Sequence, residues 1–538
     1  YAGGDSNRKA HHTDEYEVPN LVVRRGQAFE ITVTYDRAIN DATDEIKFIF
    51  QTGQCSTLSE NKAFSESVKN SEWGAQHVGD SGNDVTYKLM TPANAVVDEW
   101  SMIVQTIFDH KNRKMNRYRY KVKDTFYVLF NAWCKEDTVY MANEEERQEY
   151  VLQQIGMIWR GSAGANGPMM WNYKQFDDVC LDGSLFLLKK SGFSVQARSN
   201  SALTCRALAQ MANSNNNDGG VLSGNWSGNY NGGISPSTWQ GSGSIMEQYM
   251  RTKSDVKWAQ CWVFSGLLTT LCRAIGIPTR SVTNFESAHD TDSSMTIDTH
   301  YDSVTLKLVF SLFRNFHVWN ESYMKRLDLP DGYDGWQAHD STPQEASENL
   351  MRCGPASVIA IKNGDIHINY DGKFVFAEVN GDRVSWIVEP DGNMIAVQSE
   401  IDTVGKEMST KAVGRMARND VTHEYKHAEG KSIFLCDGQR PCLARHPSTL
   451  FCIAGVSKDG NKIQFVNTFT RTKRRFRTIP SLVPQIRVTN NSNEERNVKL
   501  NIQAVASYYT GMTGEDLKTV NSNLIIAAKG SRSPNVQA

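Results

Sequence analysis

Apolar and polar side chains alternate along the first part of the chain. The alternating apolar positions are Phe29, Ile31, Val33 and Tyr35 near its start and Tyr118, Tyr120 and Val122 near its end. A two-residue period predicts strands that bury one face. Because turn residues separate these short strands, we expect a β-sandwich over residues 17–124. The polar residues 1–16 before it predict a flexible tail.

A helical spacing follows Cys261. The apolar residues that recur three and four positions apart are Leu267, Leu268, Leu271, Ala274 and Ile275. This spacing predicts a helix with one buried face, which Gly276 and Pro278 then end. Cys261 therefore lies where a loop enters a helix N-terminus, and the free amides and positive dipole there favour a thiolate. A cysteine nucleophile needs this condition, although a lone cysteine is more often a small buried hydrophobe.

The rest of the chain divides into a mixed region and a second β region. Residues 125–434 combine helical and strand patterns, with Asn143 and Glu146 spaced as a capping box, and we expect the catalytic unit here. The Gly- and Asn-rich stretch 212–244 holds several aromatic residues, so ordered loops are favoured over a flexible linker. Alternation returns in residues 435–538, which predicts a second sandwich or an open barrel.

Length and charge limit the possible functions. A chain of 538 residues with 40% apolar residues predicts three or four domains with large cores. The 58 basic residues nearly balance the 60 acidic ones, which argues against a nucleic-acid or anionic-membrane partner. No apolar run is long enough to span a bilayer, and no signal-peptide pattern is visible. The chain nevertheless opens on Tyr1 rather than Met, which is compatible with a removed leader.

The ten cysteines are scattered and form no CxxC pair. This distribution argues against a local zinc module. We expect mostly free thiols in a reducing compartment.

A catalytic thiolate needs a proton acceptor, and the acceptor needs an orienting group. His317 and Asp340 lie in two short segments downstream of Cys261 that read as strands. Neighbouring strands would hold the imidazole and the carboxylate side by side next to the helix. His289, His300 and His339 are alternative bases, and a core histidine without a catalytic role is the simpler interpretation of His317 alone. Cys–His–acid residues by themselves also permit a thiol hydrolase.

Several motifs resemble those of animal transglutaminases. The resemblance is strongest to the transglutaminases of invertebrate blood cells. The resembling stretches are Arg24–Gln27, Phe130–Cys134, Gln260–Phe264, Arg280–Asp290, Gly335–Gln337, Phe376–Asn380 and Ser409–Arg415. The resemblance runs from about residue 14 to about residue 515. It implies an α+β multidomain fold: an N-terminal immunoglobulin-like β-sandwich, a papain-like α/β catalytic core over residues 125–434, and a C-terminal β-barrel over residues 435–538. The family's second C-terminal barrel is expected to be missing.

The resemblance also implies a reaction. Cys261 would attack the carboxamide of a protein glutamine, His317 would carry the proton, and Asp340 would orient His317. A lysine amine would then take the acyl group from the thioester, giving an isopeptide bond. Trp239 matches a tryptophan whose indole N–H helps to hold the oxyanion, and apolar walls would exclude water. The implied partners are clotting or matrix proteins, and the implied location is the blood-cell cytoplasm with release to the extracellular space.

Calcium is the cofactor that the resemblance implies. Three polar loops offer the oxygen ligands that calcium prefers. The candidate ligands are Asp290, Asp292 and Ser294 in one loop, Asn213, Asn215 and Asp218 in a second, and Asn380, Asp382 and Glu429 in a third.

Two stretches, 303–314 and 432–450, depart from the family pattern. Arg314 stands where a tryptophan lines the amine tunnel, and Ser311 stands where an aspartate completes the first calcium loop. A missing carboxylate weakens calcium binding, and an arginine repels an incoming lysine. These departures keep a non-catalytic scaffold as an alternative to the cross-linking enzyme and the thiol hydrolase. Tyr509 matches a tyrosine that covers the cysteine in resting enzymes, so a lid-type movement is also expected.

Overall fold

The computed structural model divides the chain into two compact units, which are described separately. One unit holds residues 1–293 and 297–428, and the other holds residues 294–296 and 429–538. The described residues are 4–40, 44–53, 55–59, 72–109, 115–289, 296–303, 308–311, 313–388, 394–400, 402–427, 449–455, 488–489, 496–507, 513–526 and 531–532. Within these ranges, no helix combines the length and the apolar character that a membrane span requires.

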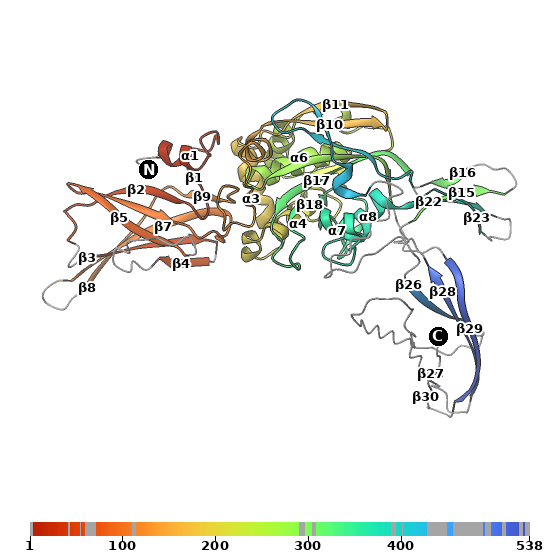
Figure 1. The fold of residues 1–538 in the computed structure, drawn as a ribbon. Coiled ribbons are helices and arrows are strands. Elements are labelled where there is room, and N and C mark those ends of the chain that lie inside the picture. Colours follow the sequence, from red (N-terminus) through yellow and green to blue (C-terminus); the bar gives the residue numbers. More distant parts are fainter. Residues whose placement is uncertain are drawn as a thin grey trace. The chain divides into compact units, whose positions relative to one another are not determined.

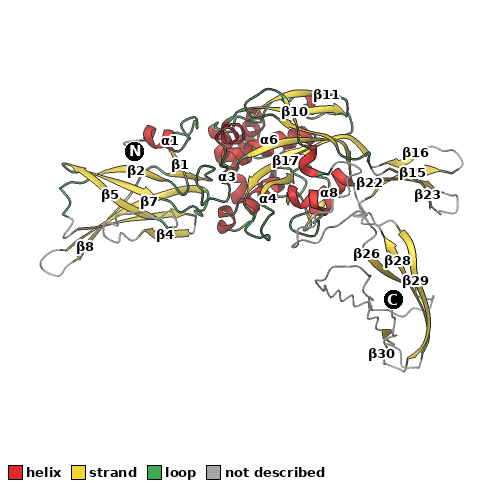
Figure 2. Cartoon of the chain, viewed as in Figure 1, coloured by secondary structure: helices red, strands yellow, loops and turns green. Residues whose placement is uncertain are grey.

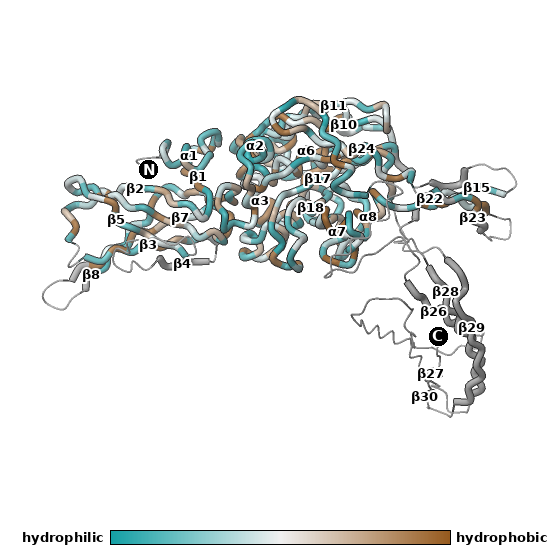
Figure 3. The backbone as a smooth tube through the Cα atoms, in the orientation of Figure 1, coloured by the Kyte–Doolittle hydropathy of each residue, from teal (hydrophilic) through white to brown (hydrophobic). Residues whose placement is uncertain are grey.

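The N-terminal part of the first unit consists of two sheets that share one core (Figure 1). The strands are β1 (Leu21–Arg24), β2 (Ala28–Thr34), β3 (Asp44–Thr52), β4 (Cys55–Ser59), β5 (Gly74–Ser81), β6 (Asp84–Met90), β7 (Asp98–Asp109), β8 (Met115–Lys121) and β9 (Phe126–Leu129). The larger sheet has the order β1-β9-β7-β3-β4 with β8 on β7, and the smaller has the order β2-β6-β5. Hydrophilic and hydrophobic positions both occur along β2 and β6 (Figure 3), where buried residues recur at every second position. Two packed sheets agree with the expected sandwich.

The alternation of apolar and polar residues predicts burial correctly in β2 but not in β8. Phe29 and Ile31 of β2 are buried in the core. Tyr118 and Tyr120 form the equivalent stripe in β8 but are 59% and 66% exposed. β8 is paired with β7 alone, so its tyrosines lie on a sheet margin, which the sequence pattern does not reveal.

The boundary expected at residue 124 is wrong by one strand. The apolar run from Phe126 was assigned to the catalytic region, but β9 pairs with β1 in parallel and with β7 in antiparallel orientation. It is therefore a central strand of the N-terminal sheet. A central strand is buried on both faces, which explains its continuous apolar sequence.

The expectation of a flexible tail is also wrong for residues 4–16. Gly4–Ala10 form helix α1, and Asn7, His11 and Tyr16 are buried. Arg8 donates hydrogen bonds to the backbone carbonyls of Tyr16 and Asn20 at 3.1 and 2.9 Å. These polar side chains satisfy backbone groups of the sandwich instead of facing solvent, so their composition misled the prediction.

The rest of the first unit packs helices against a six-stranded antiparallel sheet (Figure 2). The sheet has the order β21-β18-β17-β14-β24-β25, with bounds β14 (Thr279–Ala288), β17 (Phe313–Met324), β18 (Gly335–Asp340), β21 (Cys353–Ser357), β24 (Lys406–Lys411) and β25 (Arg418–Asp420). The main helices are α3 (Asp178–Lys190), α4 (Ser201–Ala212), α5 (Gly243–Thr252), α6 (Cys261–Ala274), α7 (Val358–Asn363) and α8 (Gly372–Asn380). Helix α6 packs against α3, α4, β14 and β17. This mixed architecture agrees with the expected α+β class.

Smaller elements complete the unit. The helical ones are α2 (Glu144–Arg147), which leads into a π-helix over Gln148–Leu152, two 3₁₀ turns at Val195–Ser199 and Pro236–Thr238, and α9 (Thr422–Tyr425). The strands are β10 (Ile155–Ser162), β11 (Ala165–Asn172), β12 (Leu222–Gly224), β13 (Val256–Ala259), β15 (Thr296–Asp302), β16 (Leu308–Ser311), β19 (Ala346–Ser347), β20 (Leu350–Met351), β22 (Asp382–Val388) and β23 (Met394–Glu400). Asn143 caps α2 as expected, because its side chain accepts from the amides of Glu145 and Glu146.

Helix α6 begins at Cys261 and ends before Gly276, as the sequence predicted. Gly276 has φ +92°, a backbone conformation that favours glycine. The helix is nevertheless buried along its whole length, with all fourteen residues covered. The expected single buried face is therefore wrong. A helix that is covered on every side lies at the centre of a domain rather than on its surface.

The described part of the second unit consists of strands. β26 (Thr449–Gly455), β28 (Arg496–Ser507) and β29 (Thr513–Ile526) form an antiparallel sheet, and β27 (Val488–Thr489) pairs with β30 (Ser531–Arg532). This agrees with the β pattern predicted after residue 435. Whether the strands close into a barrel stays a prediction.

Candidate active site

Cys261 is the first residue of α6 and is only 6% exposed. Gln260 precedes it in an extended conformation and caps the helix with its carbonyl, which accepts from the amides of Val263 and Phe264. The amide of Cys261 comes before these first helical bonds, so the helix itself offers it no acceptor. The sulfur therefore lies beside free N–H groups and at the positive end of the helix dipole.

Strands β17 and β18 bring His317 and Asp340 together. The strands are antiparallel, with Asn320 opposite His339. His317 lies three residues before Asn320 and Asp340 directly follows His339, so this pairing brings the two side chains close together. His317 Nε2 lies 2.7 Å from Asp340 Oδ2, and both side chains are buried. Because a carboxylate can only accept, Nε2 carries the proton. The two predicted strands and their pairing are confirmed.

The third member of the group is Cys261, whose thiol interacts with the His317 ring. The other ring nitrogen, Nδ1, is buried and has no hydrogen-bond partner in the described part of the chain. This nitrogen is therefore the one left for the sulfur. The structure brings together the three residues that the sequence proposed as a triad.

Polar contacts hold α6 against β17 and so fix the distance between the thiol and the imidazole. The amide nitrogen of Asn320 donates to the carbonyl of Ser265 at 2.9 Å and to Thr269 Oγ1 at 2.8 Å. The hydroxyl of Ser265 donates to the carbonyl of Trp319 at 3.0 Å. These groups are all buried, where a lost hydrogen bond is costly. The helix and the strand are thus held in one register.

The electrostatic surroundings favour a protonated His317. Burial lowers the pKa of the imidazole, but the Asp340 carboxylate, the Cys261 thiol and the Glu378 carboxylate raise it, and the net pKa is about 10. The ring is therefore an imidazolium at neutral pH. A cation held next to a thiol favours the thiolate, since the two opposite charges offset each other's burial.

Two residues in this network were not proposed as site residues. Glu378 of α8 lies 3.8 Å from His317 Nε2 and is buried. The amide nitrogen of Gln344 donates to Asp340 Oδ2 at 3.0 Å and to Glu378 Oε1 at 3.1 Å. Glu378 stands inside the stretch Phe376–Asn380 that carries the family resemblance, which was a usable signal. Gln344 follows Asp340 by four positions and has no distinguishing pattern.

Aromatic side chains line the start of α6. Trp262 is buried and stacks on Phe316, with ring centroids 6.1 Å apart, and Trp226 stacks on Phe264 at 6.4 Å. The stretch 212–244, expected to form ordered loops, is described throughout. Trp239 is buried there, and its indole N–H donates to the carbonyl of Trp258 at 3.0 Å. In this conformation the N–H proposed for the oxyanion is occupied by a backbone carbonyl.

The alternative histidines lie in other environments. His339 points to a different cluster, and burial lowers its pKa to about 3. His289 lies 3.0 Å from Glu345 Oε1. His300 lies in β15, which belongs to a different sheet from β17 and β18. None of them has the contact with Asp340 Oδ2 that His317 has.

The candidate calcium ligands are only partly described. Asp290, Asp292, Ser294 and Glu429 lie outside the described residues, as does Tyr509. Asn380 ends α8, and Asp382, which is 5% exposed, opens β22 directly after it. A carboxylate beside the negative end of a helix dipole favours a cation, and amide and carboxylate oxygens are hard ligands. The described pair therefore offers oxygen ligands of the type that calcium takes.

The loop after α4 is held by its own hydrogen bonds. Asn213 Oδ1 accepts from the amide of Asn215, and Asp218 accepts from the Gly220 amide and from Gln210 Nε2. Asn213 is buried and Asn215 is exposed. The side-chain oxygens of these three residues are of the type that calcium prefers.

The two unusual positions fall in strands of different sheets. Ser311 ends β16, which pairs with β15. Arg314 lies in β17, three residues before His317, and its backbone is paired with Ser287. The stretch 432–450 is outside the described residues except for its last two positions, Thr449 and Leu450, which open β26.

Two family models match this chain. The model described as "Transglutaminase family" matches residues 3–107, and the model described as "Transglutaminase-like superfamily" matches residues 227–341. The second match contains Cys261, His317 and Asp340. The first overlaps the two-sheet region that precedes the mixed region.

Curated relatives and a solved structure agree with these matches. Protein-glutamine gamma-glutamyltransferase K of Oryctolagus cuniculus is 38% identical over 98% of this chain and 63% of its own length. Annulin of Schistocerca americana is 40% identical over 86% of this chain and 61% of its own length. The chain thus spans a little under two thirds of these relatives. The crystal structure of red sea bream transglutaminase superposes with a TM-score of 0.71 at 31% identity, covering 99% of this chain and 78% of that one.

Proposed function

The chain belongs to the transglutaminase family, and we propose that it joins the side chain of a protein glutamine to that of a lysine. The observation that carries this proposal is the buried group of Cys261, His317 and Asp340, with a His317 pKa of about 10. A thiolate paired with an imidazolium supplies both the nucleophile and the proton that the leaving group needs.

The first half of the reaction releases ammonia. The Cys261 sulfur attacks the side-chain carbonyl carbon of glutamine, and the carbonyl becomes an oxyanion beside the free amide of Cys261. The C–N bond breaks as the imidazolium of His317 gives its Nδ1 proton to the departing nitrogen. Ammonia leaves, and a thioester on Cys261 remains. Asp340 keeps the ring oriented through Nε2.

The second half transfers the acyl group. A lysine amine attacks the thioester carbon, and neutral His317 accepts the proton that the amine loses. The C–S bond breaks and the product is an isopeptide. Water must be kept away at this stage, because its attack would give glutamate instead. The covered sulfur and the buried Trp262, which stacks on Phe316, support this exclusion.

The oxyanion role of Trp239 requires a local change. Its N–H would have to leave the carbonyl of Trp258, to which it donates in the structure. Substrate binding near the start of α6 could supply the new acceptor. Until that change occurs, the Cys261 amide is the oxyanion donor that the helix geometry supports.

Calcium is proposed as the activating ion. When bound, it supplies a hard divalent charge that gathers carboxylate and amide oxygens. Asn380 and Asp382 would hold it at the end of α8, the helix that also carries Glu378. A second ion would use Asn213, Asn215 and Asp218, and a third would use Asp290, Asp292 and Ser294, with Ser311 in place of a further carboxylate. We propose clotting or matrix proteins as substrates and release from blood cells as the setting.

Amine incorporation tests this function directly. The protein is incubated with casein and a fluorescent primary amine over a series of calcium concentrations. The proposal predicts calcium-dependent labelling that Cys261→Ala abolishes. Cys180→Ala is the matched control, because Cys180 is a buried free thiol in α3 and should leave labelling unchanged.

Two results would contradict the proposal. Absence of labelling at every calcium concentration, with a folded protein, would favour a non-catalytic scaffold. Release of ammonia without labelling would favour hydrolysis of glutamine by the same thiol.

A further inference from the structure

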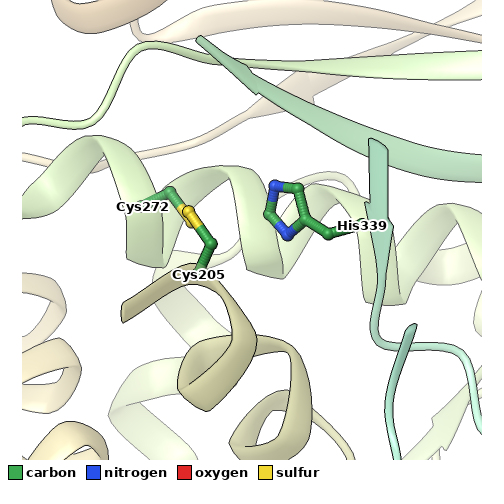
Figure 4. A group of neighbouring side chains, drawn as sticks. All are labelled: Cys205, Cys272 and His339. Carbon is green, nitrogen blue, oxygen red and sulfur yellow. The ribbon is translucent and has the colours of Figure 1, made fainter. Parts of the chain in front are cut away.

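A second group of buried side chains lies in the same unit as the catalytic triad. Cys205 of α4, Cys272 of α6 and His339 of β18 point toward one another (Figure 4). Each offers one potential ligand atom, and these three atoms lie within 4.8 Å of one another. All three residues are buried, and both cysteines are free thiols. The residues come from three distant parts of the sequence, so no short sequence motif predicts this group.

Only one of the two ring nitrogens of His339 has a hydrogen-bond partner among the described residues. Its Nε2 lies 2.8 Å from Ser322 Oγ, which in turn lies 2.8 Å from Thr279 Oγ1. Its Nδ1 is buried and has no hydrogen-bond partner among the described residues. A ring that gives its N–H to a fixed oxygen presents the lone pair of its other nitrogen, which is how metal-binding histidines are held.

The charges of the three groups also matter. Burial lowers the pKa of His339, so the ring is neutral at physiological pH, and burial together with the neighbouring Cys205 raises the pKa of Cys272. Without a cation the Cys272 thiol stays protonated. A divalent cation that replaces two thiol protons gives a complex with no net charge, which suits a buried site. A monovalent cation with two thiolates would leave a buried negative charge.

We propose that Cys205, Cys272 and His339 bind one thiophilic divalent cation, of which zinc is the reference. Two S–H bonds break, two metal–sulfur bonds and one metal–nitrogen bond form, and two protons pass to solvent. Two thiolates and an imidazole are ligands that zinc accepts and calcium does not. The site is therefore distinct in chemistry from the calcium loops.

The position of this site gives it a mechanical role. Cys272 lies in the last turn of α6, whose first residue is Cys261. His339 is followed directly in β18 by Asp340. A bound cation would tie the helix of the nucleophile to the strand of the orienting carboxylate. It would stabilise the catalytic arrangement without touching the substrate.

Metal content and spectroscopy test the proposal on the whole chain. The protein is stripped with a chelator, reloaded with zinc or cadmium in excess calcium, and separated from free ions. We expect about one zinc per chain by elemental analysis, and a sulfur-to-cadmium charge-transfer band in the ultraviolet. Cys205→Ala and His339→Leu should each lose the tightly bound ion, whereas Cys180→Ala should keep it. The wild-type cadmium band needs no variant, so a folding defect in one variant cannot hide the answer.

Three outcomes would overturn the proposal. The first is that the wild type binds neither zinc nor cadmium in excess calcium. The second is that the Cys205→Ala and His339→Leu variants bind the ion as well as the wild type does. The third is a Cys205–Cys272 disulfide, which would appear as two missing thiols in a count made in denaturant without reductant and would be located by peptide mapping.

Discussion

His317 is the residue on which the proposed chemistry depends most. Its ring is buried, and burial alone would leave it neutral. Asp340, Cys261 and Glu378 raise its pKa to about 10 instead. The surrounding charges therefore outweigh the desolvation. The positive charge on this one ring is the feature that the proposed reaction uses beside the sulfur of Cys261.

Glu378 offers a test of this electrostatic balance. Glu378→Gln keeps the shape and the acceptor for Gln344 but removes a charge 3.8 Å from Nε2. The pKa of His317 should fall, so the alkaline limb of the pH–rate profile should move to lower pH. The measurement is kcat/KM for a glutamine peptide with hydroxylamine, which stays unprotonated in this range. Glu145→Gln, at an exposed position of α2, is the control. An unchanged alkaline limb would contradict this role.

At the same scale, sequence patterns found some site residues and missed others. Cys261, His317 and Asp340 stand in motifs, so residue type and resemblance were enough. Gln344 and Glu378 act through contacts between β18, α8 and the loop after Asp340, and only folding brings these segments together. The occupied N–H of Trp239 depends on the carbonyl of Trp258, and backbone acceptors leave no trace in a sequence.

Helix α6 shows how packing overrides a sequence pattern at the scale of elements. Its apolar spacing predicted one buried face, but the polar residues between also lie inside and bond to β17. Its start and end were predictable because capping and glycine signals are local. Its central position was not, because it depends on which strands and helices cover the remaining faces.

Gly266 of α6 gives a stability test of this packing. A Cβ there would lie 2.3 Å from the buried indole of Trp171. Alanine gains about 1 kcal/mol in helix propensity, but overpacking a rigid core costs about 1–3 kcal/mol. We therefore expect Gly266→Ala to lower the free energy of unfolding, measured by chemical denaturation. Gly167→Ala, where nothing lies within 4 Å, should be close to neutral. A more stable Gly266→Ala protein would show that the indole can move.

Helix α1 and the turn after it are expected to make stability sensitive to acid. His11 Nδ1 accepts from the Arg24 amide, and Nε2 lies 3.0 Å from the carbonyl of Ala28. The bond that Nδ1 accepts requires a neutral ring, and burial lowers the pKa of His11 from 6.5 to about 4. The unfolded chain therefore binds the proton first. The contribution to stability is complete above pH 6.5 and is lost as the pH falls toward 4.

The measurement is the midpoint of thermal unfolding between pH 7.5 and pH 4. His11→Asn can keep an acceptor for Arg24 without titrating, so its midpoint should fall less with acid than that of the wild type. His367→Asn, at an exposed position, should follow the wild type. Identical acid sensitivity in all three proteins would assign the loss to other groups.

For the whole molecule, the order of β, mixed and β regions was predictable from periodicity, because each region is long. The boundary after residue 124 was not, since β9 belongs to the N-terminal sheet by pairing with β1. The site of Cys205, Cys272 and His339 was also hidden, because the expected zinc signature is a short local spacing. Contacts between segments that are distant in the sequence determine both the boundary and the position of this group.

The calcium response is a property of the whole chain. Asp382→Asn should raise the calcium concentration for half-maximal amine incorporation, because divalent binding depends on ligand charge. Ser311→Asp should lower it, since it supplies the further carboxylate that the family resemblance implies beside Asp290 and Asp292. Asp331→Asn, at an exposed position, is the control. If neither Asp382→Asn nor Ser311→Asp changes the calcium requirement, the assigned loops do not bind the activating ion.

The most direct test of the account is the rate at which iodoacetamide alkylates Cys261 across pH 5 to 9, read by mass spectrometry of its peptide. In the wild type we predict faster reaction at Cys261 than at buried Cys180 and Cys353, with reactivity that persists below neutral pH. His317→Gln removes the cation and should slow the reaction most strongly at acidic and neutral pH. Equal rates in the wild type and His317→Gln, throughout this range, would contradict a thiolate held by the imidazolium.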